Sequence, residues 1–137
     1  MEKTHRPIPQ AVGYTDTQPF WEAAARGQFV IQRCDSTGRL QHPPRPTSVQ
    51  TGLRALGWQE VSGKGSLYSW TLTHSAWPGH EGRVPYLCAY VDLDEGARVL
   101  CNLIHCQPDD LRMGMRMRLA WEQLVDNVMY PAFEPDT

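Results

Sequence analysis

The sequence has no long apolar run, little lysine and only four cysteines. No stretch approaches the ~20 apolar residues of a membrane-spanning helix, and the start MEKTHRPIPQ lacks the apolar run of a signal peptide. Lysine occurs only at Lys3 and Lys64, and a net charge of -2 gives no general attraction to nucleic acid or to an anionic membrane. We therefore expect a cytoplasmic protein with reduced cysteines and with neither nucleic acid nor membrane as a partner.

The chain is long enough for one domain with a short appendage. Its 137 residues are 41% hydrophobic, which is enough for a real core and too much for a disordered chain. No internal repeat and no low-complexity tract is present. Cys88, Cys101 and Cys106 fall in apolar stretches, where we expect small buried hydrophobic side chains rather than a disulfide or a metal site.

Two short segments have the layout of the knuckles of a zinc ribbon. In such a ribbon each knuckle supplies two thiolates, and a glycine after the second one lets the backbone turn around the metal. Gly38 and Gly52 stand at the two glycine positions. The four positions expected to hold ligands are Cys34, Thr37, Ser48 and Thr51.

Only one of these four positions holds a cysteine. A neutral hydroxyl is a poor substitute for a thiolate on a borderline-soft cation, so we predict a ribbon without zinc. An alternative is a metal held by Cys34, His42 and a carboxylate, although Asp35 is poorly placed beside Cys34.

The N-terminal part of the chain divides into an arm, a helix and the ribbon. Residues 1–15 are polar and proline-bearing, and read as an extended arm. A short helix is predicted to follow, because Asp16 or Thr17 can cap it, Pro19 suits a first turn and Gly27 can end it. We divide the chain into arm and helix (1–27), ribbon (28–55) and a β domain with a C-terminal tail (56–137).

The rest of the chain predicts strands without the regular alternation of strands and helices that a parallel α/β fold requires. Residues 115–122 alternate most clearly between apolar and polar, and Asp94-Glu95-Gly96 predicts a hairpin turn. A single helical turn is expected at residues 108–112, before this strand. The fold class is therefore mainly β, with an N-terminal helix, a degenerate metal-free ribbon and a five-stranded OB-fold barrel. The clearest predicted strands are residues 65–73, 86–93, 97–105 and 115–122, and a short apolar terminal segment follows at residues 129–133.

In its order of motifs the chain resembles the family called domain-of-unknown-function 35 (DUF-35). The motifs are Phe20-Trp21-Glu22, the Cys34 knuckle, Pro43-Pro44-Arg45, the segment from Gly63 to Thr71, the segment from Val91 to Arg98, and Pro131-Ala132-Phe133. The resemblance implies a helix, a rubredoxin-like zinc ribbon and an OB-fold. It also implies a non-catalytic partner subunit of a thiolase, acyltransferase or lipid-transfer-protein-like aldolase that acts on acyl-CoA thioesters, in a hetero-oligomer.

Three sets of side chains are candidates for binding. An acyl-CoA-binding module is the alternative function, and Arg33, Arg45 and Arg54 are the candidate phosphate ligands. The apolar residues predicted to lie outside the barrel and to contact a partner are Phe20, Trp21, Tyr130, Pro131 and Phe133. A less favoured alternative is an OB domain that binds single-stranded nucleic acid through Tyr68, Trp70, Tyr86 and Tyr90.

No arrangement of residues predicts catalysis by this chain. His105 and Cys106 are neighbours on a predicted strand, so their side chains point to opposite faces. Cys101 and His105 share a face, but about 13 Å separates them at ~3.3 Å per residue. We therefore assign no catalytic residue and no cofactor other than a candidate acyl-CoA ligand.

Overall fold

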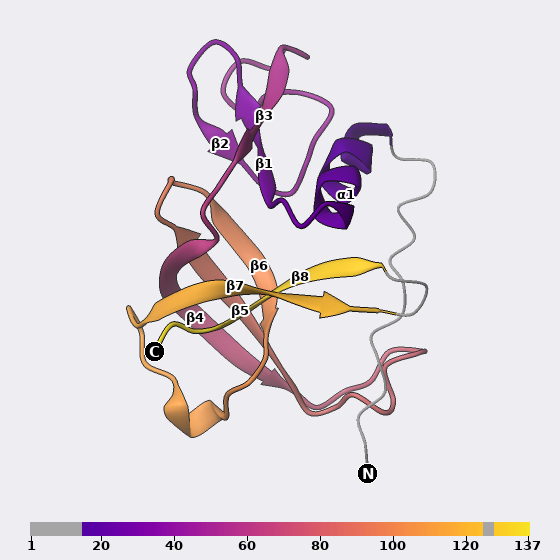
Figure 1. The fold of residues 1–137 in the computed structure, drawn as a ribbon, viewed down its shortest axis with the longest axis vertical. Helices are drawn as coiled ribbons and strands as arrows, with labels where there is room; N and C mark the ends of the chain where they lie inside the picture. The colour runs from indigo at the N-terminus through magenta and orange to yellow at the C-terminus, as the bar shows by residue number, and fades with distance from the viewer. Residues whose placement is uncertain (1–14, 125–127) are drawn as a thin grey trace.

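The computed structural model of the protein describes residues 15–124 and 128–137. Residues 1–14 of the predicted arm (residues 1–15) lie outside the described residues. A helix and a three-stranded sheet stand above a closed barrel (Figure 1), which confirms the predicted mainly β class with an N-terminal helix and a five-stranded barrel. Within the described residues, no helix is long and apolar enough to cross a membrane.

Helix α1 (Gln18–Ala25) follows a single 3-10 turn, η1 (Thr15–Thr17). Pro19 lies in its first turn, and Gly27 follows its end with a φ of 73°. The predicted cap is wrong in one respect, because Thr17 occupies the N-cap position without a side-chain capping hydrogen bond. The buried residues Phe20, Ala23 and Ala24 form the face that packs against the rest of the molecule.

The ribbon contains a three-stranded antiparallel sheet with β1 in its centre. Strand β1 (Val30–Cys34) pairs with β2 (Leu40–Gln41) on one side and with β3 (Leu56–Glu60) on the other. By its hydrogen bonding β3 belongs to the ribbon, so the boundary predicted at residue 55 falls a few residues early. The alternation of apolar residues that begins at Leu56 marks a strand, but it cannot say which sheet the strand joins.

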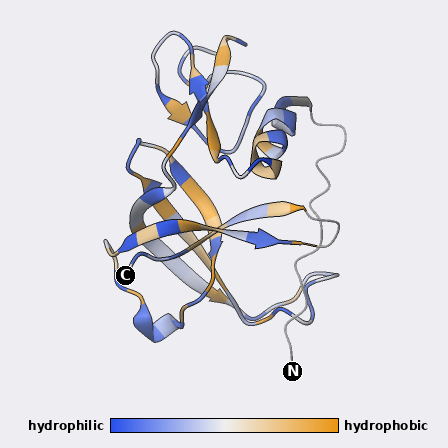
Figure 2. Ribbon diagram, in the orientation of Figure 1, coloured by the Kyte–Doolittle hydropathy of each residue, from blue (hydrophilic) through white to orange (hydrophobic). Residues whose placement is uncertain are grey.

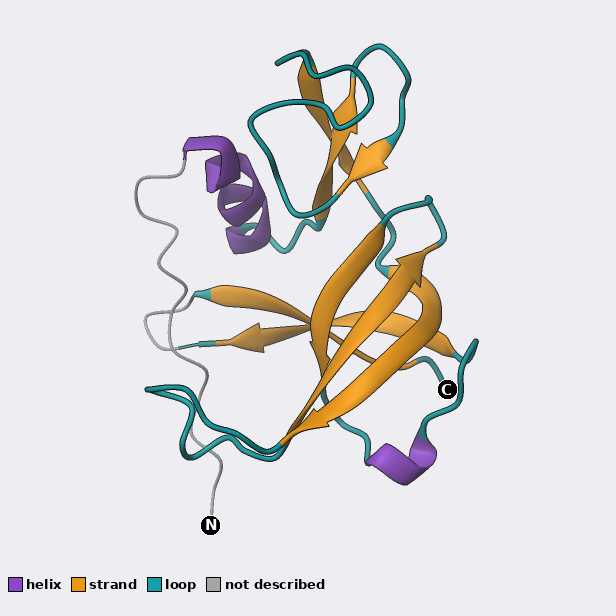
Figure 3. Cartoon of the chain, turned by 180° about the vertical axis from the view of Figure 1, so that it is seen from behind, coloured by secondary structure: helices purple, strands orange, loops and turns teal. Residues whose placement is uncertain are grey.

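The barrel consists of five strands in the order β4-β5-β6-β8-β7. Between β4 (Lys64–Thr73) and β5 (Tyr86–Leu93), the loop 74–85 extends away from the barrel (Figure 3), and we call this loop with the adjoining strand ends the β4–β5 arm. The hairpin between β5 and β6 (Arg98–Leu103) and the single turn η2 (Pro108–Asp110) before β7 (Arg116–Gln123) are as predicted.

Strand β8 (Met129–Pro135) closes the barrel, so the prediction that the C-terminal apolar segment lies outside it is wrong. It pairs along its length with β7, and its buried residues Ala132 and Phe133 face the core. On the other side it meets β6 at one parallel register pair, Leu103 with Phe133. The two prolines of β8 lack the N–H that a longer ladder requires.

Strand β4 can pair on both sides at Gly65 because this residue has no side chain. Gly65 lies opposite Leu93 of β5 and Met117 of β7. A Cβ added there would meet the carbonyl oxygen of Asp92 and the side chain of Val91. The glycine therefore permits the close strand approach that barrel closure needs.

One hydrophobic core runs through helix, ribbon and barrel, and apolar segments follow the strands of both sheets (Figure 2). Phe29, between α1 and β1, contacts Phe20 at a ring-centroid distance of 6.1 Å, Trp121 at 6.2 Å and Phe133 at 6.1 Å. We call these four rings the aromatic junction. It fixes the ribbon on the barrel, since α1, β7 and β8 each contribute one ring.

The His42 imidazole packs at the edge of this junction, 5.7 Å from the Phe20 ring. Among the described residues its buried Nδ1 has no hydrogen-bond partner. Burial disfavours the imidazolium and lowers the pKa of His42 from 6.5 to about 4.

We predict that this histidine makes the fold acid-sensitive. The unfolded chain takes up a proton below pH 6.5, whereas the folded chain does so only near pH 4, so stability is lost as the pH falls through this window. The loss from this group between neutral pH and about pH 5 is about 2 kcal/mol. Urea unfolding at both pH values measures it. In His42→Leu the free energy of unfolding should fall less between neutral pH and about pH 5 than in the wild type, whereas the exposed-site control His74→Leu should behave as the wild type does. An equal decrease in the two variants would contradict the prediction.

Candidate functional site

Both knuckles of the ribbon keep the backbone of a metal-binding turn. The amide of Gly38 donates to the Cys34 carbonyl at 2.8 Å, and the amide of Gly52 donates to the Ser48 carbonyl at the same distance. The two glycines have φ values of 73° and 75°, in the left-handed region that favours glycine. Because both turns have the same hydrogen bond and nearly the same glycine φ, the prediction of two equivalent turns is confirmed.

Hydrogen bonds join the predicted ligand positions to one another. Cys34 and Ser48 are almost fully buried, and the Ser48 and Thr37 side chains hydrogen-bond to the Cys34 thiol. These bonds, Ser48 first, lower the pKa of Cys34 to about 7. Ser48 Oγ also accepts from the Thr51 amide at 3.3 Å. Hydroxyl groups therefore occupy the positions where a zinc ribbon places sulfur.

This donor set does not fit a zinc ion. Structural zinc sites take four thiolate or imidazole ligands, whereas the two knuckles offer one thiol and three neutral hydroxyls. Within residues 15–124 and 128–137, no group of three or more His, Cys, Asp or Glu side chains is placed to hold a metal. The alternative site of Cys34, His42 and a carboxylate finds no support among these residues, and the absence of zinc stays a prediction.

Two buried glutamines, which the sequence reasoning missed, connect the ribbon strands to the loop between the knuckles. Gln41 Nε2 donates to Gln32 Oε1 at 2.7 Å, and Gln32 Nε2 donates to the Arg45 carbonyl at 2.8 Å. Gln41 Oε1 accepts from the Val49 amide at 2.9 Å. Buried amides with this many partners hold irregular backbone in place without a metal.

Two of the three predicted arginines meet at one surface hollow. Arg45 and Arg54 line a hollow of about 200 Å³ together with Trp58, next to the start of α1. Arg33 follows Gln32, which also lines the hollow, and successive side chains of a strand point to opposite faces. Arg33 is thus separated from the other two, and Trp58 is the missed member of the set.

The predicted partner residues mostly pack inside the chain. Phe20 is 6% exposed and Phe133 is 1% exposed, so neither ring is available to a partner. Trp21 and Tyr130 are half-buried and contact each other at a centroid distance of 5.8 Å, and Pro131 is half-buried in β8. The contact between Trp21 and Tyr130 joins α1 to the barrel. The apolar character of these residues could not show from sequence alone that they pack within this chain rather than against a partner.

The aromatic residues considered for nucleic-acid binding do not form one basic surface. Tyr68 and Tyr90 are exposed on the barrel, whereas Trp70 packs against the core. The Arg98 guanidinium lies 3.6 Å from the Tyr68 ring centroid and is bound by Asp92 at 2.6 Å, so its charge is neutralised. The geometry gives no support to a nucleic-acid groove there.

Comparison with known protein families matches both parts of the chain. Residues 21–47 match the family described as ChsH2, rubredoxin-like zinc ribbon domain, and residues 58–122 match ChsH2, C-terminal OB-fold domain. Together these matches cover most of the chain.

Relatives and solved structures show the same similarity. The chain is 36% identical over 118 residues to a probable enoyl-CoA hydratase alpha subunit of Thermomonospora curvata, covering 85% of this chain and 36% of that protein. It is 32% identical to a DUF35 domain-containing scaffold protein of Pyrococcus furiosus, covering 71% of each. A chain of the structure titled Ltp2-ChsH2(DUF35) aldolase superposes with a TM-score of 0.80 at 34% identity, over 96% of this chain and 100% of that chain. The chain spans only about a third of the length of the hydratase subunit.

We predict that restoring the missing thiols restores the metal site. The purified wild-type chain should contain no stoichiometric zinc, because three of its four donors are neutral hydroxyls. The triple variant Thr37→Cys, Ser48→Cys, Thr51→Cys should bind one zinc ion per chain, because both knuckle backbones are already in place. Elemental analysis measures both proteins. Stoichiometric zinc in the wild type, or none in the triple variant, would refute the argument.

Proposed function

The chain belongs to the DUF35 family, and we propose that it is a non-catalytic subunit of a thiolase-superfamily enzyme that acts on acyl-CoA thioesters. The observation that carries the proposal is the superposition of 96% of this chain on a chain of the Ltp2-ChsH2(DUF35) aldolase, whose name gives two components. An aldolase, a thiolase or an acyltransferase partner in a hetero-oligomer fits equally well.

Exposed apolar side chains support a role in assembly. Val49 lies within the second knuckle, Leu53 follows it, and Trp77 lies in the loop of the β4–β5 arm; all three are exposed large hydrophobic residues. Apolar side chains in solvent are commonly covered in a complex, where aromatic anchors supply much of the affinity. The four unpaired cysteines are compatible with the reducing cytoplasm, where we place the complex.

Affinity purification of the tagged chain from its source tests the proposal. We expect a stoichiometric thiolase-superfamily protein to be retained, and carbon–carbon bond cleavage or acyl transfer to require that protein and to increase when the chain is added. A chain that remains monomeric and retains no such protein, or that turns over acyl-CoA on its own, would sink the proposal.

A second candidate function is contact with the nucleotide end of acyl-CoA at the hollow of Arg45, Arg54 and Trp58. Two guanidinium groups suit phosphates, and an indole offers a stacking surface for adenine. Asp16 also lines the hollow, so its carboxylate opposes an anion there.

Calorimetry with CoA at low salt tests this candidate. The double variant Arg45→Ala, Arg54→Ala should weaken binding by about tenfold or more, because each removes a charge-assisted hydrogen bond. Arg33→Ala is the matched control and should bind as the wild type does. Absence of heat at millimolar CoA, or an equal effect of the control, would exclude nucleotide binding at this hollow.

A further inference from the structure

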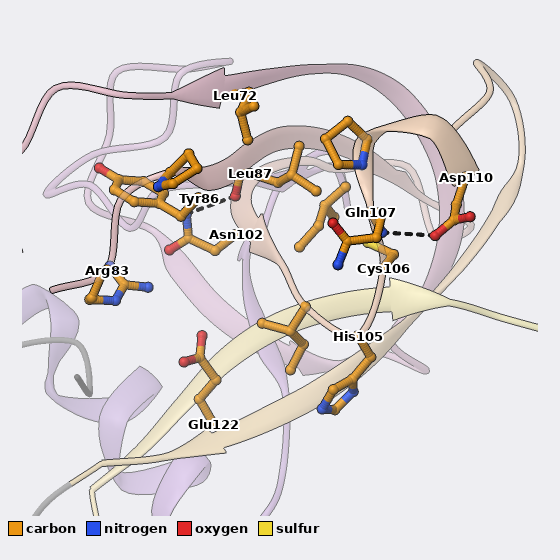
Figure 4. Close-up of a pocket in the computed structure, with 14 residues that line it drawn as sticks. Leu72, Arg83, Tyr86, Leu87, Asn102, His105, Cys106, Gln107, Asp110 and Glu122 are labelled. Carbon is orange, nitrogen blue, oxygen red and sulfur yellow. Dashed lines mark hydrogen bonds between the residues drawn. The ribbon is translucent and has the colours of Figure 1, made fainter. Parts of the chain in front are cut away.

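A cavity of about 690 Å³ lies between the β4–β5 arm, the segment that leads from β6 into η2, and β7 (Figure 4). It belongs to none of the sites described so far. Its lining includes Leu72 and Arg83 of the arm, Asn102 and Ile104 at the end of β6, Asp110 of η2, and Glu122 of β7. We call it the barrel cleft.

The floor of the barrel cleft is apolar. Leu87 and Leu103 are buried, and Leu72 and Ile104 are half-buried. Such a floor suits the aliphatic stem of a long side chain, whose polar end then has to reach a charged group.

Glu122 is that charged group. Its Oε1 is buried, and among the described residues it has no hydrogen-bond partner. The carboxylate rises from β7 toward the space between the other lining residues (Figure 4). A buried carboxylate oxygen without a donor is costly, and an ammonium or guanidinium group is the partner that relieves this cost most fully.

The remaining charges of the cleft agree with a cationic ligand. Asp110 adds a second carboxylate on the far side of the cleft. Arg83 is the one cation with a fixed charge among the described lining residues; its guanidinium lies 4.9 Å from the Tyr86 ring centroid, and its Nη1 lies 2.9 Å from His80 Nδ1. Its guanidinium therefore contacts the side of the cleft that carries His80 and Tyr86. His105, at the rim, lies 2.6 Å from Glu134.

We propose that the barrel cleft binds a basic side chain, an arginine or a lysine, on a segment of the partner subunit. The stem lies on the leucine and isoleucine floor, and the cationic end bonds Glu122 Oε1. The identity of the partner rests on the proposed function, whereas the preference of the cleft for a cation does not.

Titration of the isolated full chain tests the preference for a cation. Acetyl-arginine-amide should shift the NMR signals of Leu72, Asn102 and Ile104 saturably. The isosteric neutral acetyl-citrulline-amide should bind about tenfold more weakly, the usual effect of removing a charge-assisted hydrogen bond. Glu122→Gln should abolish this difference, and the control Glu60→Gln on the exposed end of β3 should keep it. Equal binding of the two amides, or the lack of saturable shifts, overturns the proposal.

Thermal unfolding distinguishes a binding role of Glu122 from a structural one. In the free chain Glu122→Gln should leave the melting temperature unchanged or raise it, because a neutral amide is less costly to bury than a carboxylate. The same variant should weaken the complex with the partner by about tenfold or more. A lower melting temperature, or an unchanged affinity, overturns the proposal. An unchanged affinity of the variant does not affect the proposed function. If the wild type forms no complex at all, the proposed function is wrong, and the titration with the two amides still tests the cation site independently.

Discussion

The packing of Phe29 against Phe20, Trp121 and Phe133 is the interaction on which the other features depend. Phe29 lies in the short link between α1 and β1, yet it contacts rings from the helix and from two barrel strands. Edge-to-face aromatic pairs combine large buried area with a preferred geometry, so they fix orientation as well as proximity. The knuckles, the arginine hollow and the barrel cleft are therefore parts of one body with a shared core.

Local chemistry was predictable from the sequence, and the pairing of distant segments was not. The glycines that follow each knuckle and the alternation of residues 115–122 identified turns and a strand correctly, because neighbouring residues determine both. Strand β8 was misplaced, since two prolines and a short apolar run look like a tail until β7 supplies its ladder. Trp58 and Glu122 escaped notice because only tertiary structure brings them to the arginine hollow and to the barrel cleft.

The ribbon shows how a metal-binding backbone is kept with a different set of side chains. The knuckle turns depend on glycine and on backbone hydrogen bonds, which do not require the ion itself. The Cys34 thiol then accepts hydrogen bonds from hydroxyls, and the Gln32–Gln41 pair bonds the backbone of Arg45 and Val49 in and after the intervening loop. The buried Cys34 thiol and the two buried glutamine amides thus all have partners, which is the condition under which a buried polar network stabilises a fold.

The seam between β6 and β8 is joined by few backbone contacts among the described residues. These strands meet at Leu103 and Phe133 and through the bond from the Ile104 amide to the Phe133 carbonyl, while each is held firmly by its other neighbour. Opening along this line would break few backbone hydrogen bonds, because few join the two strands among the described residues. Because Ile104 belongs to both the seam and the lining of the cleft, a change of spacing along the seam would change the shape of the cleft as well.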